Sequence, residues 1–391
     1  MSAAAEVLGN IDGDASALQC AWIDAAEDFI ALAPEWDTLQ ERARVGHPFL
    51  SHAWLRTWWE HFAGDAQLRI LVARAGGTLV GAAPMMLVTR RIYGMRVRAL
   101  EAMAGDHTPR FEFLAGHDES AVHAALWAAI RACDDEWDIV NIRQLPEGSA
   151  TLTAVRACAA RDGLRTGCWP GEVSPFVRFS DAWNRYFDSL GYNHRRNVGK
   201  SRRRLERRGG VALEVIQGGP GLAAQVGDGM RIEASAWKAD AGTAMLSEPQ
   251  RRRFYERLAE RVSEQGQLRL YFLRCGGRRI AFSYAIVASG VVYVLKAGYD
   301  PQYARFSPYQ VLCAMVLKEG FRSGLRGYDF LGGAEPWKRE WTHCARPHQW
   351  LYVFSPRIAA QWVYLLKFRL SPLIQKLAVA RGLRNLLLRS G

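Results

Sequence analysis

The residues around Ser307 have types suited to holding a phosphate group. Ser307 favours a helix N-cap, and Pro308 stands at the first helical position, where proline is preferred. Amides that begin a helix point outward with partial positive charge, which suits an anion. Arg305 adds a cation just upstream. This pattern predicts a phosphate cradle, such as one for the pyrophosphate of coenzyme A, made by Arg305, Ser307, Pro308, Tyr309 and Gln310.

A β-strand predicted at 291–296 leads into this cradle. Five β-favouring residues reach Lys296, and the following Ala297 and Gly298 can bring the backbone close to a ligand. We therefore add Lys296, Ala297 and Tyr299 to the expected ligand contacts. A largely buried helix at 311–321 and a final strand at 327–331 complete this region.

The chain that must position these residues contains a repeat at a spacing of two hundred residues. Arg69, Arg74 and the pair Gly76-Gly77 recur as Arg269, Arg274 and Gly276-Gly277. Each copy has the pattern of a β-hairpin, in which two apolar strands flank a glycine turn. A helix is predicted before each hairpin, and Ser51 favours the cap of the first.

These observations predict an α+β protein made of two similar halves. Clustered glycine and proline residues at 166–175 read as a linker between them. We accordingly expect a flexible N-terminus at 1–19, an N-terminal domain at 20–165, a C-terminal domain at 176–355 and a basic tail at 356–391. The N-terminal domain has no helix start like that at 305–310, so we expect it to be a degenerate copy that helps to shape an acceptor site.

Four motifs then carry a resemblance to a known family. They lie at residues 48–59, 195–209, 298–308 and 328–341, within a similarity that runs from about residue 20 to 355. With them the chain resembles the GNAT-type acyltransferases of bacterial cellulose and exopolysaccharide gene neighbourhoods. It is more distantly similar to the Fem-type peptidoglycan aminoacyl ligases. The family usually has glycine where this chain has Tyr309, whose ring would either crowd the phosphate or stack on the adenine.

The resemblance implies tandem GNAT-like domains, each a twisted and mostly antiparallel sheet flanked by helices. It also implies transfer of an acyl group, acetyl above all, from acyl-CoA to an amine or hydroxyl of a small or cell-envelope-related acceptor. A backbone amide within 294–297 would stabilise the oxyanion, and strands ending near Ala297 and Phe330 would part to admit the pantetheine arm. The base would be Asp329 or Glu335, with Tyr299 or Tyr328 protonating the leaving thiolate. Substrate contacts are expected from Asp300, Trp337 and Lys338.

The formal net charge of +12 is concentrated in two segments. Residues 191–210 hold eight Arg or Lys and one acid, and residues 357–391 hold seven and no acid. Within the first segment, the run 194–208 has no aromatic residue between its cations, which favours a structural or acidic-substrate role over nucleic-acid binding. The second mixes cations with Trp, Tyr, Phe and Leu, and is suited either to packing on the domain or to the surface of an anionic inner membrane.

Other motifs give narrower guidance. The seven cysteines show no paired spacing and the N-terminus has no signal-peptide pattern, so we expect a cytoplasmic protein that touches the membrane at most peripherally. His343, Cys344 and His348 lack metal-ligand spacing, and we expect no metal cofactor. Two other functions stay open: an aminoacyl-tRNA-dependent ligase, and a non-catalytic scaffold for polysaccharide synthesis at the membrane. The sequence does not indicate an oligomeric state.

Overall fold

The chain forms two compact units, and neither is one continuous stretch of sequence. The computed structural model describes residues 18–105, 107–235 and 245–371. Unit 1 comprises residues 1–44, 65–171 and 348–391, and unit 2 comprises residues 45–64 and 172–347. Residues 1–17 of the expected flexible N-terminus and 372–391 of the expected basic tail lie outside the described part. None of the described helices has the length and apolar character needed to cross a membrane.

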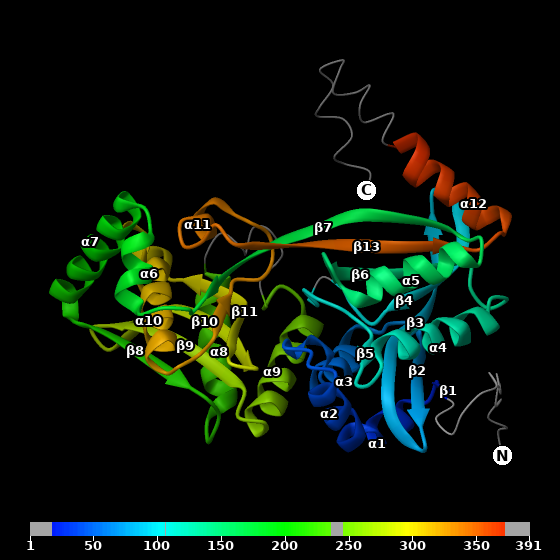
Figure 1. Cartoon of the computed structure of the whole chain (residues 1–391). Coiled ribbons are helices and arrows are strands. Elements are labelled where there is room, and N and C mark those ends of the chain that lie inside the picture. The colour runs from blue at the N-terminus through cyan, green and yellow to red at the C-terminus, as the bar shows by residue number, and fades with distance from the viewer. Residues whose placement is uncertain (1–17, 106, 236–244, 372–391) are drawn as a thin grey trace. The chain divides into compact units, whose positions relative to one another are not determined.

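Unit 1 is a mixed, mostly antiparallel sheet with helices packed on it (Figure 1). Its elements are β1 (Gln19–Ile23), α1 (Ala26–Ala31), α2 (Ala33–Arg42), β2 (Gln67–Ala75), β3 (Thr78–Ile92), β4 (Met95–Ala102), β5 (Leu114–Ala115), α4 (Glu119–Ala132), β6 (Ile139–Pro146), α5 (Ala150–Arg161), α12 (Ile358–Tyr364) and the π-helical turn η3 (Leu365–Leu370). The strand order is β1-β2-β3-β4-β6, and β6 then pairs with β13 (Ala345–Phe354). The β4–β6 pair is parallel, and the neighbouring pairs are antiparallel.

Unit 2 repeats this plan. Its elements are η1 (Pro48–Leu50), α3 (His52–Phe62), α6 (Trp183–Ser189), α7 (Tyr192–Gly209), β8 (Val211–Ile216), α8 (Leu222–Ala234), α9 (Pro249–Glu264), β9 (Leu268–Cys275), β10 (Arg278–Ala288), β11 (Val291–Tyr299), η2 (Pro301–Phe306), α10 (Pro308–Arg322), β12 (Gly327–Asp329) and α11 (Pro336–Arg339). The strand order is β8-β9-β10-β11-β12, and β12 pairs with the second part of β7 (Arg165–Arg178). Only the β11–β12 pair is parallel among these described strands.

Helices cover both faces of the unit 2 sheet. Ala281 of β10 packs in the same cluster as the α10 residues Val311 and Leu312. The next residue, Phe282, lies against Gly229 of α8, where a Cβ atom would come within 2.3 Å of its ring. Because successive strand residues point to opposite faces, α10 and α8 lie on opposite sides of the sheet.

The predicted hairpin repeat is confirmed in detail. The β2–β3 turn has φ angles of 53° and 80° at Gly76 and Gly77, and the β9–β10 turn has 56° and 78° at Gly276 and Gly277. The second glycine of each turn also accepts a hydrogen bond from the preceding arginine, at 2.7 Å from Arg74 and 2.8 Å from Arg274. The two hairpins therefore share their local chemistry as well as their backbone path.

Helix α3 belongs to unit 2, although its sequence precedes most of unit 1. As predicted, Ser51 caps it, and the Ser51 hydroxyl accepts a hydrogen bond from the amide of Trp54 at 3.1 Å. The fully buried Trp54 ring meets Phe254 of α9 edge to face, with 5.6 Å between ring centroids. Arg261 of α9 reaches Glu60 at 2.7 Å. A domain running continuously from 20 to 165 is therefore wrong, because α3 completes its packing on α9.

The linker predicted at 166–175 is also wrong, because these residues form part of strand β7. The glycines there serve close packing. A Cβ atom on Gly167 would lie 2.6 Å from the Phe368 ring, and one on Gly171 would lie 3.1 Å from the backbone oxygen of His348. The expected boundary at 355 shifts as well, because residues 348–354 of β13 belong to unit 1.

Candidate functional site

Strands β11 and β12 part after only three paired residues. Their parallel register covers Val291–Gly327, Val292–Tyr328 and Tyr293–Asp329. Strand β11 continues to Tyr299, paired with β10 on its other side. The chain after β12 follows β7 instead, since the amide of Phe330 donates to the carbonyl oxygen of Pro175 at 3.0 Å. The two strands therefore part as expected. We call this parting the notch; β11 residues 294–299 lie beyond the last pairing with β12.

The register of β11 shifts beside the notch. Val294 pairs with Ala285 and Lys296 with Tyr284, so Leu295 is an extra residue in the ladder. Such a bulge bends a strand and turns its backbone groups away from their regular partners. It falls within the 294–297 segment from which an oxyanion-binding amide was expected.

Helix α10 begins beside this segment, as the Ser-Pro pair predicts, but Ser307 does not cap it as expected. Ser307 has a left-handed conformation with φ 45°, and its side chain makes no capping hydrogen bond. Its backbone carbonyl instead accepts from the amides of Gln310 and Val311 at 3.0 and 3.3 Å. The physical reason is the short helix η2, which ends at Phe306 and requires a sharp change of chain direction before Pro308.

Three arginines gather at this end of α10. The guanidinium groups of Arg204 and Arg305 each lie 4.8 Å from the centroid of the Phe306 ring, and that of Arg208 lies 5.9 Å from it. Arg204 also donates to the backbone oxygen of Arg305 at 3.2 Å. Within the described residues, none of the three has a carboxylate partner among the ion pairs. We call Arg204, Arg208 and Arg305 the arginine cluster; its charge suits a phosphate-bearing ligand.

Only Arg305 of this cluster was predicted. The signal for the other two was present in the sequence, because Arg204 and Arg208 are four residues apart and so share one face of a helix. The outward face of α7 carries four further cations, all of them exposed: Arg196, Lys200, Arg203 and Arg207.

Tyr309 points into the protein and does not reach a ligand. Its ring is buried and meets Trp337 at 5.4 Å between centroids. Burial raises the pKa of Tyr309 and of Tyr328 well above the usual tyrosine value, and raises that of Cys313 beside them to about 12. Stacking of Tyr309 on an adenine is therefore excluded. Tyr328 keeps its proton, and its role as donor to a thiolate stays a prediction.

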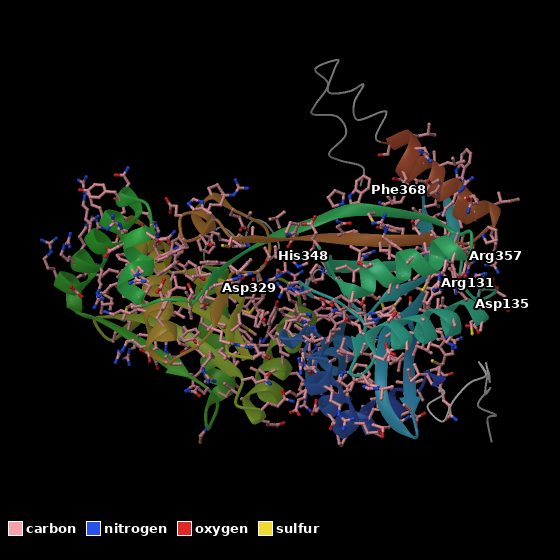
Figure 2. All side chains as sticks on the ribbon, viewed as in Figure 1. Arg131, Asp135, Asp329, His348, Arg357 and Phe368 are labelled. Carbon is pink, nitrogen blue, oxygen red and sulfur yellow. The ribbon has the colours of Figure 1, made fainter. Side chains whose placement is uncertain are left out.

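Asp329, which is labelled in Figure 2, has its carboxylate held by three partners, one of them the cation Arg346. It is 2% exposed and accepts hydrogen bonds from the Ser174 hydroxyl at 3.2 Å and the Leu331 amide at 3.0 Å. Arg346 forms an ion pair with it at 3.0 Å. This arrangement favours a structural role in the loop that follows β12, against its predicted role as the base.

Lys338 closes the same loop from the other end. Its ammonium group donates to the backbone oxygens of Leu331 and Gly333 at 2.6 and 2.9 Å, and pairs with Glu335 at 2.6 Å. These partners use all three hydrogens of the ammonium group. The predicted roles of Lys338 in substrate binding and of Glu335 as base are therefore not favoured, and Trp337 packs against Tyr309 and Phe330.

We expect Asp329→Asn to lower stability rather than catalysis. The change leaves Arg346 without its negative partner and should reduce the free energy of unfolding by about 1–3 kcal/mol. Urea unfolding measures this difference. Asp188→Asn removes an exposed partner of Arg195 and serves as the control, with little expected change. A stable Asp329→Asn protein with greatly reduced turnover would contradict this expectation and restore Asp329 as a base.

The other predicted residues divide between the two sheet faces. Ala297 and Tyr299 pack against the cluster that contains α10. Lys296 lies on the opposite face, with its ammonium group 5.5 Å from the Tyr255 ring. Asp300 caps η2 through the amide of Gln302 at 2.9 Å and pairs with Arg278 at 2.8 Å, which favours a structural role.

A buried carboxylate that was not predicted lies on the Lys296 side of the notch. Glu233 of α8 is 0% exposed and accepts a hydrogen bond from the amide of Met245 at 2.8 Å. Its backbone presses on β11, since a Cβ atom on Gly298 would come within 2.5 Å of the Glu233 Cα. Burial, and secondarily the charge of Glu233, raises the pKa of Tyr255. Glu233, Lys296 and Tyr255 thus form a group beside β11 residues 296–298.

The equivalent place in unit 1 is filled by the chain itself. Strands β4 and β6 also pair over only three residues, ending at Glu101–Asn141. The loop that follows β4 then lies along β6, with the amide of Phe111 donating to Gln144 at 3.0 Å. Met103 and Phe111 of this loop are fully buried. The backbone that a pantetheine arm would need is thus occupied, which supports a degenerate first copy.

A surface depression in unit 2 is a candidate for a competing site, because its volume is large enough for a small ligand. An open depression of about 550 Å³ lies around β8, α8 and the β9–β10 turn of unit 2. Its Arg279 is already paired with Glu214 and Asp228, at 2.7 and 2.6 Å. No group of three or more His, Cys, Asp or Glu side chains is placed to bind a metal within the part of the chain that the structure describes.

Comparison with known proteins agrees with this geometry. Residues 192–339 match the family model described as an acetyltransferase (GNAT) domain. The solved structure of FemX superposes with a TM-score of 0.59 at 11% identity, covering 86% of this chain and 98% of that one. No curated protein sequence matches the chain.

Two further structures resemble it. The C-terminal domain of a putative lysylphosphatidylglycerol synthetase from Agrobacterium fabrum gives a TM-score of 0.53 at 13% identity, covering 87% of this chain and 98% of that one. L-PGS from Bacillus licheniformis gives 0.52 at 12% identity, covering 85% and 94%. At these identities the similarity establishes the fold alone. The chain therefore has a GNAT fold, and its residues 192–339 match the model of the acetyltransferase (GNAT) domain.

Proposed function

We propose that unit 2 transfers an acyl group from acyl-CoA to an amine or hydroxyl. The observation that carries this proposal is the early parting of β11 and β12 beside the start of α10. Beyond Tyr293 the described part of β11 is no longer paired with β12, and a pantetheine arm would pair with it there as an added strand. The arginine cluster lies at the same end of α10 and suits the phosphates of the donor.

In this proposal the transfer uses only groups of the two substrates and of unit 2. The acceptor nitrogen or oxygen bonds to the thioester carbonyl carbon, and an amide of the bulged segment 294–297 donates to the oxygen as it becomes negative. Glu233 takes the proton of the attacking group. The carbon–sulfur bond then breaks, and the proton taken by Glu233 passes to the thiolate of CoA, so the products are the acylated acceptor and free CoA.

The acceptor class is inferred from the sequence motifs. The four motifs at 48–59, 195–209, 298–308 and 328–341 resemble those of enzymes from cellulose and exopolysaccharide gene neighbourhoods. We therefore propose a small or cell-envelope-related acceptor, with acetyl as the transferred group.

A second function is favoured by two observations. The fold similarity to FemX covers nearly the whole chain, and a stripe of exposed cations runs along α7. This α7 stripe comprises Arg196, Lys200, Arg203 and Arg207, which lie opposite the buried residues Val198 and Leu205. An aminoacyl-tRNA-dependent ligase would use such a stripe to neutralise RNA phosphates.

Two matched double variants of α7 separate these functions. Arg204→Gln/Arg208→Gln removes two charges of the arginine cluster, whereas Arg203→Gln/Arg207→Gln removes two charges of the α7 stripe. We expect the first to weaken acetyl-CoA binding by about tenfold or more, because charge-assisted hydrogen bonds to phosphate are lost. The second should bind acetyl-CoA like the wild type. Isothermal titration calorimetry measures both affinities.

The opposite pattern would favour the ligase. In that case bulk tRNA would bind with a steep salt dependence, the stripe variant would lose this binding, and acetyl-CoA would not bind the wild type. A wild-type chain whose melting temperature no acyl-CoA raises, and which binds no tRNA, would support a non-catalytic scaffold instead.

A further inference from the structure

An apolar stripe on the outside of α12 in unit 1 has no role in the proposed transfer. Ten large apolar side chains stay exposed among the described residues, and four of them lie between 358 and 370. Ile358, Trp362 and Leu365 are 86%, 48% and 40% exposed. Ile358 and Trp362 are four residues apart and share one face of α12, and the exposed Leu365 and Arg369 follow in the π-helical turn η3.

The inward face of the same helix is fully engaged. Ala360 and Val363 pack with Tyr352 and Phe354 of β13. The Lys367 ammonium lies 4.5 Å from the Trp169 ring. Arg357, which is labelled in Figure 2, donates to the backbone oxygens of Asp134 and Trp137 at 2.7 Å each. The helix is therefore fixed to its own sheet, and the outer stripe is not needed for that packing.

The charge of the sequence that contains the stripe favours an anionic partner. Residues 357–391 contain seven cations and no acid, and four of the cations follow in 372–391 among leucines and an isoleucine. The β3–β4 turn borders the helix, since Ile92 and Met95 pack against the cluster that contains Ala360 and Val363. This turn adds the exposed Tyr93, Arg91 and Arg96.

We propose that this stripe of Ile358, Trp362, Leu365 and Arg369 binds the surface of an anionic lipid membrane. An interfacial helix of this kind lies in the plane of the membrane, with apolar residues and Trp or Tyr at the headgroup level and cations facing anionic lipid. A second protein chain would bury the apolar stripe equally well, but it would not account for a flanking segment that carries cations and no acids. The proposal concerns unit 1 and is independent of the transfer proposed for unit 2.

Vesicle co-sedimentation of the full chain tests this. Wild type should bind vesicles of equal parts phosphatidylglycerol and phosphatidylcholine, bind pure phosphatidylcholine weakly, and release as salt rises. Ile358→Glu/Trp362→Glu should lower binding to the anionic vesicles by about tenfold or more, because two apolar contacts become acidic. Ile30→Glu is the matched control, since Ile30 is an exposed apolar residue of the same unit at 37%, and it should bind like the wild type.

Two results would overturn the proposal. One is wild type that stays in the supernatant with anionic vesicles, or that loses as much binding with Ile30→Glu as with the double variant. The other is a wild-type dimer in size-exclusion chromatography that the double variant converts to a monomer without any change in vesicle binding. Because the substituted residues are exposed, the melting temperature should stay at the wild-type value.

Discussion

Replacing Glu233 with glutamine is expected to lower the turnover number of acyl transfer by about 10²–10⁴-fold, the usual contribution of a general base. The amide side chain keeps nearly the same shape and can still accept the hydrogen bond from Met245. It cannot accept a proton from the acceptor. The KM for acetyl-CoA should therefore stay close to that of the wild type, because the arginine cluster is untouched.

Steady-state kinetics at several pH values distinguish this role from a structural one. If Glu233 is the base, the turnover number of the variant falls at every pH, while its KM for acetyl-CoA stays at the wild-type value. Glu335→Gln is the comparison, since Glu335 is a half-exposed carboxylate paired with Lys338, and its turnover should match the wild type. A Glu233→Gln protein with wild-type turnover would remove Glu233 from the mechanism.

Trp54→Ala is expected to lower the free energy of unfolding by about 3–5 kcal/mol, as large-to-small changes of buried aromatic residues do. Trp54 is fully buried and touches Phe49 and Phe254, at 4.9 and 5.6 Å between centroids. All three residues belong to unit 2. The loss should therefore appear in unit 2 despite the early position of Trp54 in the sequence.

Urea unfolding combined with hydrogen exchange checks both parts of this expectation. Exchange should rise in α9 of unit 2 and stay unchanged in α4 of unit 1. Trp362→Ala, at an exposed tryptophan, is the control and should change stability by about 0.5 kcal/mol or less. Faster exchange confined to unit 1 would show that α3 does not stabilise unit 2.

The local features of this fold were readable from the sequence because their causes are local. A tight turn needs residues with positive φ angles, so the glycine pairs that begin at Gly76 and Gly276 predict both hairpins. The Ser-Pro pair predicts the start of α10. The left-handed backbone conformation of Ser307 was not predicted, because it depends on helix η2 before it.

The errors arise where distant residues decide the outcome. In the sequence, Asp329 has the position of a base at a strand end. In the fold, Ser174 and Arg346 bind its carboxylate, and the sequence does not show that they lie there. In the sequence, Gly167 has the character of a linker residue. In the fold, the Phe368 ring packs against it and requires the absence of a side chain. Glu233 shows no motif, since its burial depends on a glycine in β11 sixty-five residues later. The sequence repeat places Trp54 and Phe254 at equivalent positions, but nothing in it shows that these two residues touch each other.

The placement of β13 has a consequence for how the protein is made. This strand completes the sheet of unit 1 by pairing with β6, yet it follows all of unit 2 in the chain. A ribosome must therefore synthesise residues 172–347 before residues 348–354 emerge to cover the β6 edge. Until then, the β6 edge of the nascent chain exposes unpaired backbone donors and acceptors. This edge is the place where a chaperone would bind, or where nascent chains would associate prematurely.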